Sequence, residues 1–100
     1  MTVEIVTTDK ATANDLKQEL TKHHIETRFG IRSGKLEASP AEIIELIRFA
    51  PESIDILFDV IEKFKDRCYL LVNGNKEEPA RLRTSLREPK TFQQMFKRKN

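Results

Sequence analysis

The sequence predicts a single α+β domain: a small sheet of three or four strands with two or three helices packed on one face. Of its 100 residues, 38% are hydrophobic and 34% are charged, a composition typical of a folded domain with one modest core. Short β-branched segments alternate with segments of helical periodicity, in the order β-α-β-(β)-α-α-β. No run of apolar residues approaches the roughly 18 that a membrane-spanning helix needs.

The first elements are a strand and a helix. Residues 2–6 alternate polar and β-branched side chains, which predicts a strand. Thr12 and Asp15 have the spacing of a capping box, so a helix is expected to begin with Thr12 as its N-cap. Leu16 and Leu20 then follow at helical spacing.

A second strand is predicted over residues 25–32, with one apolar and one charged face. Ile25, Phe29 and Ile31 share the apolar face, which we expect to lie on the core. The other face holds Glu26, Arg28 and Arg32. Ser33-Gly34 indicates a turn, and residues 35–38 either return as a short hairpin partner or remain a loop.

Ser39-Pro40-Ala41-Glu42 combines an N-cap serine, a proline at the first helical position and a capping-box glutamate. It predicts a helix whose apolar face is formed by Ile43, Ile44, Ile47 and Ala50. Pro51 then ends this helix and begins another.

The helix predicted over residues 51–66 is the most amphipathic element. Its apolar face contains Ile54, Leu57, Phe58, Ile61 and Phe64. Roughly opposite lies a stripe of five carboxylates, here called the acidic ridge: Glu52, Asp55, Asp59, Glu62 and Asp66. Two interpretations of the acidic ridge stay open. It is either a solvated helix face or a protein-binding surface.

A buried strand is predicted over residues 68–72, followed by the hairpin-type turn signal Asn73-Gly74. We place the domain at 1–79 and a basic tail at 80–100. Residues 81–86 either pair as an edge strand or stay loose. Phe92, Met95 and Phe96 have the spacing of one face of a short helix.

The charge is unevenly distributed. The basic tail carries seven cations against Glu88 alone, whereas residues 1–79 hold eleven basic and fifteen acidic side chains. The cations are Arg81, Arg83, Arg87, Lys90, Lys97, Arg98 and Lys99. Three interpretations stay open: a solubilising tail, phosphate contacts to nucleic acid, and a partner-binding helix anchored by Phe92, Met95 and Phe96. The tail could also dock on the acidic ridge of its own chain or of a second copy.

No pattern in the sequence predicts catalysis. There is no nucleophile elbow, and three glycines do not form a phosphate-binding loop. His23-His24 are adjacent, whereas ligands of one metal on a helix stand three or four residues apart. We therefore predict no catalytic residue, no cofactor and no metal ligand. Cys68, the single cysteine, excludes an internal disulfide, and with no signal peptide or membrane span in the sequence a cytoplasmic protein is expected.

The order of elements over residues 2–74 resembles the effector-associated constant component domains, small adaptor modules encoded with bacterial conflict and signalling effectors. The likeness rests on residues 3–6, the helix of Leu16 and Leu20, and the helix 54–64 that leads into residues 68–72. The chain departs from that pattern in lacking a glycine-rich stretch before the last helix and in adding a basic tail. The resemblance implies a non-enzymatic adaptor of a bacterial defence or signalling system and transfers no functional residue.

The sequence thus favours a protein-interaction module that uses the acidic ridge and the apolar residues of the tail, alone or as a homo-oligomer. The alternative is a nucleic-acid-binding protein that uses the cations of the tail, and binding to a membrane is not expected.

Overall fold

The computed structural model describes residues 2–32 and 41–95. Within these ranges the chain forms an antiparallel five-stranded sheet and four α-helices, which confirms the predicted α+β class. The elements are β1 (Val3–Thr7), α1 (Lys10–Lys22), β2 (Glu26–Arg32), β3 (Ala41–Arg48), the 3-10 turn η1 (Pro51–Ser53), α2 (Ile54–Lys63), β4 (Tyr69–Val72), β5 (Asn75–Glu77), α3 (Pro79–Leu86) and α4 (Pro89–Met95). The predicted hairpin partner at 35–38 lies outside the described residues.

The strands lie in the order β2-β3-β1-β4-β5. β1 and β2 are joined through α1 and enclose β3 between them, while β3 and β4 are joined through α2 and enclose β1. The fold is therefore two interleaved split βαβ units. This order makes β2 and β5 the two edges of the sheet.

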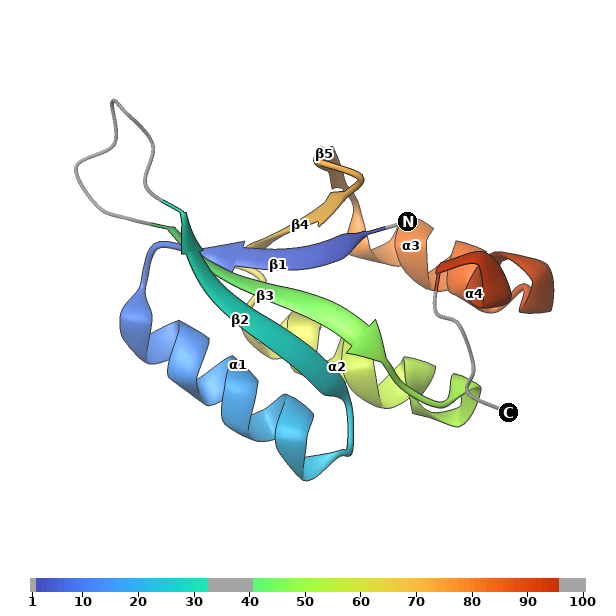
Figure 1. The fold of residues 1–100 in the computed structure, drawn as a ribbon, viewed down its shortest axis with the longest axis horizontal. Coiled ribbons are helices and arrows are strands. Elements are labelled where there is room, and N and C mark those ends of the chain that lie inside the picture. The colour runs from blue at the N-terminus through green and yellow to red at the C-terminus, as the bar shows by residue number, and fades with distance from the viewer. Residues whose placement is uncertain (1, 33–40, 96–100) are drawn as a thin grey trace.

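The helices lie on one face of the sheet, and the main core lies between the two layers (Figure 1). Val3 and Ile5 of β1 point into this core beside Ile44 of β3 and Leu70 of β4, and all four side chains are almost fully buried. The opposite face carries a smaller apolar cluster of Val6, Ala41 and Ile43, with Leu71 packed against it. No residue of the described helices belongs to that second cluster.

The helix predicted after Ser39-Pro40 is wrong, because residues 41–48 form strand β3. β3 pairs with β1 on one side and β2 on the other, so its backbone is hydrogen-bonded as a strand on both sides. Glu42, which sequence reasoning assigned to a capping box, lies in the strand opposite Thr7 and is buried. β3 carries apolar side chains on both faces of the sheet, with Ile44 and Leu46 in the main core and Ala41 and Ile43 on the opposite face. Its apolar residues therefore do not alternate with polar ones, and over a few residues they also satisfy helical spacing.

Helix α1 begins earlier than predicted. Asp9, not Thr12, is the N-cap: its carboxylate accepts a hydrogen bond from the Ala11 amide at 3.2 Å and another from the Thr12 hydroxyl at 2.6 Å. The bond from Thr12 is the main cause that lowers the pKa of Asp9. α1 ends at His23, its C-cap, and His24 adopts a positive φ of 60°.

The helix predicted over 51–66 is shorter in the structure. η1 occupies its first turn, and α2 then runs from Ile54 to Lys63 with Phe64 as its C-cap. The predicted apolar residues Ile54, Leu57, Phe58, Ile61 and Phe64 are buried, and Val60 is buried beside them. Ile56, the other apolar residue of α2, is 38% exposed, so the apolar face does not extend to it.

The hairpin turn at Asn73-Gly74 is confirmed. Both residues have positive φ, 52° and 82°, and together they join β4 to β5 as a two-residue loop. This is the backbone of a type I′ turn, which asparagine and glycine favour.

Residues 81–86 are neither an edge strand nor loose. They lie in helix α3, which begins at Pro79, and Leu82 and Leu86 are buried in the main core. α3 packs on α2, and α4 packs on α3 (Figure 1). The segment that we assigned to a separate tail is therefore, as far as Met95, built into the domain.

Candidate interaction surface

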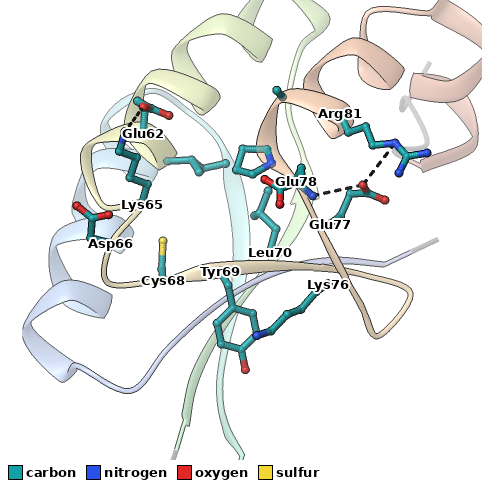
Figure 2. A pocket seen from close by; sticks show the side chains of 13 residues that line it. Glu62, Lys65, Asp66, Cys68, Tyr69, Leu70, Lys76, Glu77, Glu78 and Arg81 are labelled. Atoms are coloured by element: carbon teal, nitrogen blue, oxygen red, sulfur yellow. Dashed lines mark hydrogen bonds and ion pairs between the residues drawn. The ribbon is translucent and has the colours of Figure 1, made fainter.

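A hollow of the described surface lies where the end of α2 approaches β4, β5 and the start of α3 (Figure 2). Its volume is about 590 Å³, and its lining mixes charges of both signs. Lys65 Nζ donates a hydrogen bond to Glu62 Oε1 at 3.0 Å, and Arg81 Nε lies 3.9 Å from Glu77 Oε1. The hydrogen bond from Lys65 to Glu62 is the main cause that raises the pKa of the lysine. The charged groups of this hollow thus neutralise one another at its rim.

Cys68 is the only nucleophilic thiol of the chain and lines the same hollow. Its Sγ lies 3.2 Å from the carbonyl oxygen of Phe64, and burial raises the pKa of the thiol. A thiol acts as a nucleophile through its thiolate, which a raised pKa disfavours at neutral pH. The hollow therefore gives Cys68 no activation.

The acidic ridge is present and solvent-exposed at all five positions. It is not entirely open to a partner, because Asp55 Oδ1 accepts hydrogen bonds from Arg83 Nη2 and Arg87 Nη2 at 2.6 Å each. These bonds, with Arg83 the larger contributor, lower the pKa of Asp55. Two cations that sequence reasoning offered to phosphates thus bind a carboxylate of the same chain and fasten α3 to α2.

The apolar residues predicted as anchors of the tail have different positions. Phe92 is 2% exposed, belongs to the main core and packs edge-on against Phe49 with ring centroids 5.3 Å apart. It is not available on the surface. Met95 is the last residue of α4, and Phe96 lies outside the described residues. Of the remaining predicted cations, Lys90 is exposed on α4, while Lys97, Arg98 and Lys99 are outside the described ranges.

The β2 edge is the feature that sequence reasoning did not identify. β2 is seven residues long and, within the described part of the chain, pairs only with β3. Phe29 is 37% exposed and Ile31 63% exposed, and both lie on the helix-side face of the strand. They are two of the four large apolar side chains that are exposed among the described residues.

Neighbouring groups fix β2 without covering it. Lys17 of α1 lies over the Phe29 ring at 5.0 Å from its centroid. On the other face Arg28 lies 3.6 Å from Glu45 of β3. Gly30 is on that face too, and a Cβ built there would meet nothing within 4 Å. The backbone of β2 is accordingly paired with β3 on its inner side, and no strand of the described residues pairs with its outer side.

The helix-free face of the sheet is acidic at its centre. Glu4 and Glu45 stand opposite each other on β1 and β3. Towards β5, the Tyr69 ring lies under Lys76, whose Nζ is 4.7 Å from the ring centroid (Figure 2).

The comparisons with known proteins add no relative: protein-family models, curated proteins and solved structures all give no match to this chain. No group of three or more potential metal ligands gathers anywhere in 2–32 and 41–95. None of the helices in those ranges is long and apolar enough to cross a membrane.

Proposed function

We propose that this chain is a protein-interaction module that binds an extended segment of a partner along the β2 edge. The observation that carries the proposal is a seven-residue edge strand whose two large apolar side chains, Phe29 and Ile31, are exposed. An added strand gains main-chain hydrogen bonds from such an edge, and its alternate side chains gain apolar contacts. An unprotected edge of this kind is also a template for strand pairing.

The acidic ridge is a second part of the same proposal. Asp55 is bound by two arginines, but the ridge also has Glu52, Asp59 and Asp66 exposed on the surface. A basic partner could contact these side chains in addition to the β2 edge. Because they are exposed, salt should weaken this contribution, whereas strand pairing should persist.

Nucleic-acid binding is the less well supported function. Arg83 and Arg87 bind Asp55, and Arg81 lies within ion-pair distance of Glu77, so three cations of the tail already have acidic partners. A test of this alternative uses fluorescently labelled single-stranded and duplex oligonucleotides in a salt titration. Tight binding that falls steeply with salt and weakens on Lys90→Ala would favour it.

The main test is capture of partners from the native host by the tagged full-length chain, with nuclease treatment and a high-salt wash. Wild type is compared with Ile31→Lys and with Tyr69→Lys, a matched control because Tyr69 is 43% exposed but lies on β4, away from the β2 edge and outside the acidic ridge. The proposal predicts a protein that Ile31→Lys loses and Tyr69→Lys keeps. Equal capture by both variants, or bound material that nuclease removes, would contradict it.

A further inference from the structure

We infer that the partner strand is β2 of a second copy, paired antiparallel about a two-fold axis through Phe29. This inference rests on the proposed function, because it names the partner of the same edge. A strand that pairs with its own copy forms an isologous interface, in which residue i faces residue j and residue j faces residue i. The sequence of the strand must therefore be complementary to the same sequence read in the opposite direction. β2 meets that condition over its full length when the pair is centred on Phe29.

The register that centres on Phe29 brings opposite charges together. It places Glu26 opposite Arg32 of the second copy at both ends of the paired segment. Arg28 falls opposite Gly30, so no cation faces another. Opposite charges that face each other across strands stabilise pairing, and like charges destabilise it.

The neighbouring symmetric registers lack this complementarity. Centring the pair on Arg28 sets that arginine against itself, and centring it on Gly30 sets Arg28 against Arg32. In symmetric antiparallel pairing, two residues that face each other point to the same side of the sheet, so odd-numbered residues face odd-numbered ones and even-numbered residues face even-numbered ones. The registers adjacent to the one centred on Phe29 are therefore those centred on Arg28 and on Gly30.

A pair centred on Thr27 would set Glu26 against Arg28, but it would join only residues 26–28 of β2. The register centred on Phe29 is therefore the one that pairs the whole strand without setting like charges against each other.

The apolar side chains fit the same register. Phe29 would lie beside Phe29 of the second copy and Ile31 beside Thr27, all on the helix-side face. Aromatic cross-strand pairs are stabilising, and both exposed apolar groups lose contact with water. On the other face, the open space at Gly30 leaves room for Arg28 of the second copy. The product is one continuous sheet with the helices of both copies on the same face.

Sedimentation velocity on the full chain tests the inference. Wild type should form, in a concentration-dependent manner, a species of about twice the 11.6 kDa of the chain. Glu26→Arg alone places Arg against Arg32, and Arg32→Glu alone places Glu against Glu26, so each should dimerise at least about fivefold more weakly. Mixed in equal amounts, the two variants should form a heterodimer, because each cation then faces a carboxylate.

Lys76→Glu, a charge reversal on the other edge strand, is the matched control and should dimerise like wild type. Circular dichroism and thermal melts verify that each variant is folded. A wild-type chain that stays monomeric up to millimolar concentration overturns the inference, as do folded single variants that self-associate like wild type or a mixture that forms no heterodimer. If the chain is monomeric but Ile31→Lys still loses a different captured protein, only the second-copy inference fails and the proposed function stands.

Discussion

The two edges of the sheet differ in how they are protected. β5 is three residues long, contains Lys76 and Glu77, and leads within two residues into Pro79 of α3. Short length, charge and a nearby proline are the usual protections of an edge against strand addition. β2 also contains charged residues, namely Glu26, Arg28 and Arg32, but it is seven residues long, contains no proline, and exposes Phe29 and Ile31. Its length, its lack of proline and its exposed apolar side chains make β2 the less protected of the two edges.

Helices α3 and α4 follow the protected edge strand β5 in the chain. Substitution of Phe92 in α4 tests whether these helices are held by the main core. Phe92→Ala should lower the free energy of unfolding by about 3–5 kcal/mol, because the ring is buried against Phe49. Urea denaturation measures the loss, with exposed Gln93→Ala as the control on the same helix. A loss below about 1 kcal/mol would mean that α4 is only loosely attached.

Replacement of a glycine by alanine should change the free energy of unfolding in opposite directions at Gly74, in the turn before β5, and at Gly30, in β2. Gly74→Ala should cost about 1–2 kcal/mol, since its φ of 82° suits glycine and strains alanine. Gly30→Ala should be neutral or stabilise the fold by up to about 1 kcal/mol, because its φ is not positive and the added methyl meets nothing within 4 Å. Chemical denaturation of both variants decides the matter, and a comparable loss at the two sites would contradict the described backbone.

Ile31→Lys should leave the isolated fold almost unchanged, within about 0.5 kcal/mol, because the side chain is 63% exposed. Its effect should instead be on association. Thermal melts at low protein concentration measure the fold, and Tyr69→Lys is the comparison. A large loss of stability at that concentration would show that Ile31 has a structural role, and the capture experiment would then need Phe29→Lys as a second variant.

The smallest effect is a pH dependence of the contact between α2 and α3. The hydrogen bonds from Arg83 and Arg87 lower the pKa of Asp55 below its usual 3.8. The stabilisation that these hydrogen bonds contribute is therefore complete above pH 3.8, the usual pKa of the carboxyl. It is lost as the pH falls through the lower pKa that Asp55 has in the folded state. The melting temperature of wild type should exceed that of Asp55→Asn near neutral pH, and the difference should shrink below pH 3.8. A difference for Asp55→Asn that persists in acid would contradict the ion pairs.

Most of the fold could be predicted from local signals. The alternation of β1 and β2, the apolar face of α2 and the Asn73-Gly74 turn each depend on neighbouring residues, and the structure has all of them. β3 could not be recognised in this way, since its strand conformation depends on pairing with β1 and β2. α3 was missed although Pro79 is a helix-start signal, because the end of the domain was placed at that residue.

The candidate site could not be predicted from the sequence for a similar reason. Alternation correctly grouped Ile25, Phe29 and Ile31 on one face, and Ile25 is indeed buried. Whether Phe29 and Ile31 are covered depends on the strand order, which places β2 at the edge of the sheet. Phe92 shows the converse, because a residue in a basic segment was interpreted as exposed and proves to be part of the core. Local pattern gives the face of a side chain, and only the topology gives its exposure.

Amide hydrogen exchange of the wild-type chain at low and at high protein concentration tests the central claim most directly. The account predicts that amides within Glu26–Arg32 exchange more slowly at high concentration, while those of Asn75–Glu77 stay unchanged. Exchange that is independent of concentration at β2, or protection that rises equally at both edges, would contradict the claim that β2 pairs with β2 of a second copy.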